Sequence, residues 1–113
     1  MKKMEKKEKS KATTWNDVEI LVVGGGTMGS SIAQAYAQSG FNAGLIDISD
    51  EILQRALSII DKELEAAKRG GIFSPSQVEE IKQRILTTTS YEEACRGKSL
   101  KLVIETATEN IEI

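Results

Sequence analysis

Histidine is absent from all 113 residues of the chain. Without imidazole, the sequence lacks the usual general base near neutral pH, the histidine of a catalytic triad and the commonest zinc ligand. Cysteine occurs once, at Cys95, so no disulfide can close within the chain and no group of thiolates can bind a metal. We therefore expect a cytoplasmic protein with no metal site and no catalytic residue of its own.

Long apolar runs are also missing. The longest, from Ile20 to Val23, is far shorter than the roughly 20 residues that a membrane span requires, and no apolar segment follows the N-terminal lysines. With 28% charged and 40% hydrophobic residues, the composition is that of a globular domain. A chain of this length has room for one modest core, which excludes a cofactor domain and a substrate domain together.

Positive charge is concentrated at the N-terminus. Six lysines and two glutamates lie within the first eleven residues, although the whole chain has a net charge of −2. Such a stretch can bind nucleic acid or anionic lipid, but the interspersed glutamates and the lack of arginine and aromatic residues favour a solvated tail. We expect residues 1–17 to form a flexible basic leader with no nucleic-acid or membrane partner, Trp15 to anchor it by packing, and the domain to cover residues 18–113.

Hydrophobic periodicity predicts alternating strands and helices after the leader. Strands are expected at 18–23, 41–48, 85–89 and 101–105. A helix is expected at 27–39 between the first two, with Met28 among the residues of its apolar face. Ser49 is placed to cap a helix of about 20 residues that ends at Gly70, and a second helix with the N-cap Ser74 follows at once. Ser90 and Glu93 form the pattern of a capping box for a brief helix through Cys95, which we expect to be a small buried residue.

This alternation predicts an α/β fold with a parallel sheet and right-handed crossovers. The expected strand order is 3-2-1-4, and the two helices after the second strand should project from the sheet as a hairpin.

A G-x-G-x-x-G segment joins the first strand to the first helix. Gly24 allows a tight turn, Gly26 lets the backbone approach a diphosphate, and Gly29 lets helix and strand pack closely. The free amides at the helix N-terminus favour an anion, whereas Gly25 is a position where alanine would also serve. A sharp turn without a ligand gives the same pattern, but the flanking strand and helix favour a dinucleotide site. The candidate residues are Gly24, Gly25, Gly26, Thr27, Met28 and Gly29.

Asp47 ends the second strand, 18 residues after Gly29. A carboxylate there can accept hydrogen bonds from both hydroxyls of an adenosine ribose. It would repel the additional phosphate of NADP, and the next residues, Ile48 to Asp50, include no arginine, so NAD is the expected cofactor. A loop-edge aspartate or helix cap is the alternative for Asp47, and FAD or S-adenosylmethionine is the alternative for the ligand.

Three segments together resemble a known family. VVGGGTMGSSIAQAYAQSGFNAGLIDIS from Val22, the long helical hairpin, and LVIETATENIEI from Leu102 are similar to the N-terminal part of 3-hydroxyacyl-CoA dehydrogenases, including 3-hydroxybutyryl-CoA dehydrogenases. The β-hydroxyacid dehydrogenases share a G-x-M-G segment but usually lack the extended arm. The resemblance implies a Rossmann-type sheet with NAD over the glycine turn, Asp47 at the ribose and Glu109 at the nicotinamide.

The resemblance also implies an activity, the NAD-dependent interconversion of 3-hydroxyacyl-CoA and 3-oxoacyl-CoA in fatty-acid metabolism, carried out by a homodimer. In that family the helical arm contacts CoA. Lys62, Lys68 and Arg69 are the cations that this chain offers on the arm, and a solvated helix face is the favoured interpretation of them. The family's catalytic histidine and its glutamate partner would lie beyond Ile113, so we expect a truncated chain that is inactive alone. The alternative is a non-catalytic dinucleotide-binding or interaction module that works with a separate chain.

Overall fold

The computed structural model of the chain describes residues 13–106. Four parallel strands form one sheet in the order β3-β2-β1-β4, which confirms the predicted topology. The strands are β1 (Ile20–Val23), β2 (Ala43–Ile46), β3 (Ile85–Thr88) and β4 (Leu102–Glu105). The 3-10 helix η1 (Trp15–Asp17) precedes them, and the α-helices are α2 (Thr27–Gln38), α3 (Asp50–Arg69), α4 (Pro75–Gln83) and α5 (Tyr91–Ala94).

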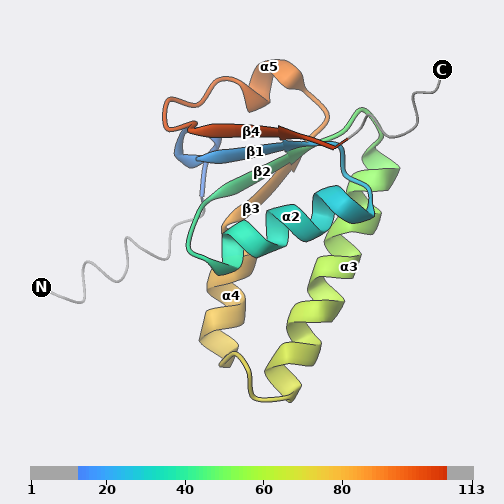
Figure 1. Cartoon of the computed structure of the whole chain (residues 1–113), viewed down its shortest axis with the longest axis vertical. Coiled ribbons are helices and arrows are strands. Elements are labelled where there is room, and N and C mark those ends of the chain that lie inside the picture. Colours follow the sequence, from blue (N-terminus) through green and yellow to red (C-terminus); the bar gives the residue numbers. More distant parts are fainter. Residues whose placement is uncertain (1–12, 107–113) are drawn as a thin grey trace, which may run out of the picture.

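Helices cover both faces of the sheet, with α2, α3 and α4 on one side and α5 on the other (Figure 1). Alternate strand residues point to opposite faces, and the core follows this alternation. Toward α2 and α3 the buried residues are Ile20, Val22, Ala33, Ala43, Leu45, Leu53 and Ala56. Toward α5 the buried residues are Leu21, Ile46 and Ala94, and Trp15 packs against them. Trp15 is therefore the packing anchor that the sequence predicted.

The helices α3 and α4 form the predicted hairpin and extend past the sheet (Figure 1). Serine caps begin both helices: Ser49 Oγ accepts from the Ile52 amide, and Ser74 forms a reciprocal capping box with Gln77. The twenty residues of α3 give a length of about 30 Å. A separate apolar cluster fills the base of the hairpin, and its buried members are Ala37, Ile60, Leu64, Val78, Ile81 and Ile85.

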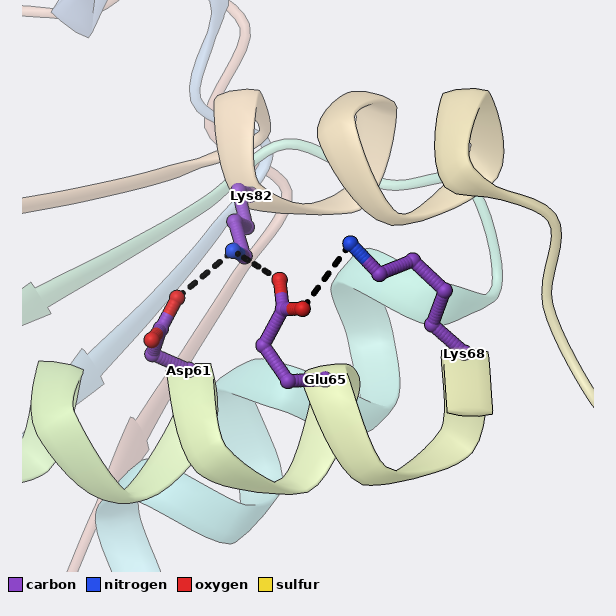
Figure 2. A network of polar contacts seen from close by, with 4 residues as sticks. All are labelled: Asp61, Glu65, Lys68 and Lys82. Atoms are coloured by element: carbon purple, nitrogen blue, oxygen red, sulfur yellow. Dashed lines mark hydrogen bonds and ion pairs between the residues drawn. The ribbon is translucent and has the colours of Figure 1, made fainter. Parts of the chain in front are cut away.

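Four charged side chains join the two helices of the hairpin (Figure 2). Lys82 Nζ of α4 lies 2.6 Å from Asp61 Oδ1 and 2.9 Å from Glu65 Oε2, both on α3. Lys68 Nζ lies 2.9 Å from the other carboxylate oxygen of Glu65. The hydrogen bonds from Lys68 and then Lys82 lower the pKa of Glu65 to about 2, and those to Asp61 and then Glu65 raise the pKa of Lys82.

Three sequence-based expectations need correction. Met28, expected on the apolar face of α2, is 64% exposed, because Gly29 and Ser30 occupy the buried side of the first turn of this helix. Cys95 is exposed rather than buried: α5 is a single turn, and Ala94 occupies its position against the sheet. The expected capping box of α5 is only half formed. Ser90 Oγ accepts the Glu93 amide, but the Glu93 carboxylate does not accept the Ser90 amide in return. It accepts from Thr88 Oγ1 at 2.6 Å, and this hydroxyl accepts the Ser90 amide.

The 3-10 helix η1 precedes Val18, where the sequence analysis expected order to begin. The remainder of the predicted leader, residues 1–12, and Glu109 lie outside the described residues. Within residues 13–106, no helix combines the length and the apolar character that a membrane span needs.

Candidate cofactor-binding site

The glycine turn lies where β1 ends and α2 begins (Figure 1). Gly24 has a φ of 108°, a conformation that favours glycine, and its amide donates to the Ile46 carbonyl of β2 at 2.8 Å. Gly29 lies directly against the turn, since a Cβ at this position would overlap the Gly24 carbonyl oxygen. The first and third glycines therefore allow α2 to start immediately beside the strand.

The N-terminus of α2 is open. Gly26 is its N-cap and provides no side-chain hydrogen bond, and the first turn contains no acidic residue. Among residues 13–106, the amides of Thr27, Met28 and Gly29 have no hydrogen-bond acceptor. The other α-helices begin with a serine whose side chain accepts an amide: Ser49, Ser74 and Ser90. The free amides and the positive end of the helix dipole make this N-terminus suitable for an anion.

The position of Gly26 also fits a ligand. A Cβ added there would meet no atom within 4 Å, so packing within the described residues does not require glycine. Gly26 is exposed above the turn, whereas Gly24 and Gly25 are buried. The missing side chain leaves space beside the free amides of α2, which is what the close approach of a diphosphate needs.

Asp47 follows β2 at the same edge of the sheet. Its Oδ2 accepts the Gly25 amide at 2.9 Å, and its Oδ1 accepts the Ser49 amide at 2.9 Å. The carboxylate thus links the glycine turn between β1 and α2 to the segment that begins α3. Each oxygen of an ionised carboxylate can accept a second hydrogen bond, so Asp47 retains capacity for ribose hydroxyls.

Gly25 is more constrained than the sequence indicated. A Cβ there would lie 3.1 Å from Leu53 Cδ2 and 3.3 Å from Ile52 Cγ2, closer than most such contacts. Alanine would require these α3 side chains to shift by a few tenths of an ångström. Glycine therefore lets α3 pack close to the turn.

Thr106 also lies at the glycine turn, although the sequence motifs did not indicate it as a candidate residue. Its amide and its Oγ1 both donate to the Val23 carbonyl, at 2.8 and 3.0 Å, and Oγ1 is also 3.2 Å from the Gly24 carbonyl oxygen. These bonds join the end of β4 to the end of β1. In the sequence, Thr106 belongs to the LVIETATENIEI segment that carries part of the family resemblance.

A small cavity of about 120 Å³ lies between the glycine turn and α3. Arg55 is the charged residue of its lining, which consists of Gly25, Gly26, Thr27, Ile52, Arg55, Ala56 and Ile59. Arg55 lies eight residues after Asp47, outside the segment from Ile48 to Asp50 in which a cation was sought. The helical path of α3 returns this side chain to the turn.

The structure thus brings Asp47 together with the glycine turn. A comparison with known families then identifies the domain that carries them. The family model for the NAD-binding domain of 3-hydroxyacyl-CoA dehydrogenase matches residues 19–113. The chain belongs to this family. NAD is the cofactor of the matched domain, and the open α2 amides and the unfilled space at Gly26 fit its diphosphate.

Relatives from several organisms show the same similarity. A 3-hydroxybutyryl-CoA dehydrogenase of Clostridioides difficile is 30% identical over 96 residues, which cover 85% of this chain and 33% of the relative. A mitochondrial hydroxyacyl-coenzyme A dehydrogenase of Rattus norvegicus is 32% identical over 97 residues, covering 83% of this chain and 31% of the relative. The chain spans about a third of the length of these relatives.

A solved structure has the same fold. The crystal structure of (S)-3-hydroxybutyryl-CoA dehydrogenase from Ralstonia eutropha aligns with a TM-score of 0.74 and 34% identity, over 82% of this chain and 32% of that chain. The chain is therefore a Rossmann-type NAD-binding domain of an oxidoreductase family.

Proposed function

We propose that the chain binds NAD with its diphosphate on the α2 N-terminus and its adenosine ribose on Asp47. The supporting observation is that two groups able to bind a ligand lie at one sheet edge. They are the uncapped amides of α2 and the Asp47 carboxylate, which accepts the Gly25 amide of the same turn. Glu109 is proposed to face the nicotinamide. The proposed cofactor-binding residues are Gly24, Gly25, Gly26, Thr27, Met28, Gly29, Asp47 and Glu109.

The proposed reaction is the interconversion of 3-hydroxyacyl-CoA and 3-oxoacyl-CoA in fatty-acid metabolism, in the cytoplasm and within a homodimeric enzyme. NAD supplies the hydride acceptor when it is bound. The role of this domain is to hold the cofactor: its helix dipole and free amides offset the diphosphate charge, and Asp47 orients the ribose. The support for the substrate class is the family to which the domain belongs.

A ligand titration tests the cofactor assignment. NADH, NADPH and FAD are titrated against the 113-residue chain, with the nucleotide or protein fluorescence as the signal. NADH should bind most tightly, because the 2′-phosphate of NADPH would lie beside the negative Asp47. Tighter binding of FAD or NADPH than of NADH would contradict the proposal.

A charge reversal tests the role of Asp47 itself. Asp47→Arg should raise the affinity for NADPH relative to NADH by about tenfold, since an arginine at the ribose attracts the 2′-phosphate. Asp50→Arg makes the same charge change in the first turn of α3 and should shift the ratio much less. The ratio separates cofactor preference from any general loss of affinity. An unchanged ratio in Asp47→Arg would show that this residue does not face the ribose.

A turnover assay tests the proposal that the 113 residues are inactive alone. A 3-oxoacyl-CoA and NADH are mixed with the chain, and the NADH absorbance is followed. We expect no oxidation, because the sequence contains no histidine to exchange a proton with the substrate oxygen. A rate of NADH loss that rises in proportion to the chain concentration would refute this proposal.

A further inference from the structure

Arg55 is a cationic residue at the cavity beside the glycine turn. It lies on α3, its side chain is exposed, and it lines the cavity of about 120 Å³ together with Gly25, Gly26 and Thr27. Cavities that enclose a drug-sized ligand measure about 300–1,000 Å³, so this one is too small for a dinucleotide. It has room for one phosphate group next to the amides of the turn.

The guanidinium is not committed to a protein partner. Within residues 13–106 Arg55 forms no ion pair or hydrogen bond, although Glu51 precedes it by one turn of the same helix. Three other cations of the hairpin are engaged, since Lys68 and Lys82 pair with carboxylates and Arg84 donates to the Ala37 carbonyl at 2.8 Å. Lys62 and Arg69 of α3 are also without such a bond among the described residues, but only Arg55 lines the cavity at the turn. Arg55 is thus available to an anion that enters from solvent.

The electrostatic surroundings of the turn call for a cation. Asp47 touches Gly25, and Asp50 and Glu51 form the first turn of α3. A diphosphate would add negative charge next to these acids, while the dipole of α2 supplies only about half a positive charge. An arginine near the turn offsets this repulsion and can donate two hydrogen bonds to phosphate oxygens.

We propose that Arg55 binds a phosphate oxygen of the dinucleotide's diphosphate and so adds a contact from α3 to those of the glycine turn. The inference rests on the proposed NAD binding. The cavity favours the diphosphate over a 2′-phosphate, because its lining includes the turn residues Gly25, Gly26 and Thr27 but not Asp47, the proposed ribose contact.

Paired arginine variants test the inference. Arg55→Gln removes the guanidinium at the turn, and Arg69→Gln makes the same change at the far end of α3, fourteen residues or about 21 Å away. NADH and NADPH are titrated against both variants and the unaltered chain. Arg55→Gln should weaken both nucleotides roughly three- to tenfold and leave their ratio unchanged, whereas Arg69→Gln should bind like the unaltered chain.

Salt dependence gives a second readout that a purely structural role would not change. The affinity difference between Arg55→Gln and the unaltered chain should shrink when salt is raised from about 0.02 M to about 0.3 M, because the contact is screened. The urea unfolding midpoints of both variants should match, since both side chains are exposed.

Each other outcome is decisive. If the unaltered chain binds NADH and Arg55→Gln binds it equally well, the role of Arg55 is overturned while the proposed function stands. A loss confined to NADPH also overturns it, because the guanidinium would then face the ribose phosphate. No NADH binding by the unaltered chain would overturn the proposed function and this inference together.

Discussion

Replacing Asp47 by asparagine should loosen the glycine turn even without a cofactor. The two carboxylate oxygens accept the amides of Gly25 and Ser49, each at 2.9 Å. Asparagine has almost the same shape but a single acceptor oxygen, so its NH₂ group must face one of the two amides. Gly25 is buried and cannot easily turn its amide to water.

The structure sets the size of the effect. A hydrogen bond to a charged group contributes about 1.5–3 kcal/mol, and the half-buried position of Asp47 reduces this to about 1–2 kcal/mol. Loss of the negative charge near the N-terminus of α3 costs a further 0.3–1 kcal/mol or so. Asp50→Asn removes the same charge at the same helix end. Unlike Asp47, the Asp50 side chain makes no hydrogen bond among residues 13–106, so this variant loses the charge alone. The difference between the two variants therefore isolates the paired amides.

Urea unfolding monitored by Trp15 fluorescence measures that difference. With a slope of about 1–1.5 kcal/mol per molar urea, the midpoint of Asp47→Asn should fall about 1 M below that of Asp50→Asn. The slopes should agree, since neither change alters the buried surface much. Coincident midpoints, within about 0.2 M, would show that the Asp47 carboxylate does not stabilise the turn.

Two further predictions concern the hairpin and the sheet. The pKa of Glu65 is lowered from 4.5 to about 2, so its contribution to stability is present above pH 4.5 and is lost as the pH falls toward 2. Urea unfolding is measured as the pH is lowered from 4.5 toward 2. The free energy of unfolding of Glu65→Gln should fall less than that of the unaltered chain or of the control Glu63→Gln. Equal losses in all three would contradict the role of the ion pairs. A Cβ at Gly44 would overlap the Trp15 ring, so Gly44→Ala should cost about 1–3 kcal/mol. That cost should vanish in a Trp15→Ala background, and an equal cost in both backgrounds would refute the explanation.

Elements with strong local signals were predicted well. The caps Ser49 and Ser74, the helix-compatible spacing of apolar residues in α3 and the glycine turn after β1 depend on interactions within a few residues, which the sequence displays directly. The parallel arrangement of the strands followed from the alternation of elements and the handedness of crossovers. The strand order followed from the doubly wound NAD-binding fold that the glycine motif and the resemblance imply.

The errors arose where a local pattern has two outcomes. Met28 has the spacing of a core residue, but Gly29 and Ser30 take the buried side of the first turn of α2 and Met28 is exposed. Cys95 lies one residue after Ala94, and a helix of a single turn buries only one of them. Glu93 has two nearby donors, and the threonine hydroxyl of Thr88 replaces the expected backbone amide.

Sequence alone determined the α/β alternation, the glycine turn and the carboxylate that follows the second strand, because each is encoded in neighbouring residues. Only the tertiary structure decided how these parts meet. It joins Asp47 to Gly25, closes Thr106 onto the Gly24 carbonyl and brings Arg55 to the turn. These contacts link residues that are far apart along the chain. The geometry of these contacts depends on the register of the strands and on how closely α3 packs against the glycine turn. Both require residues from two distant segments, so neither segment determines them by itself.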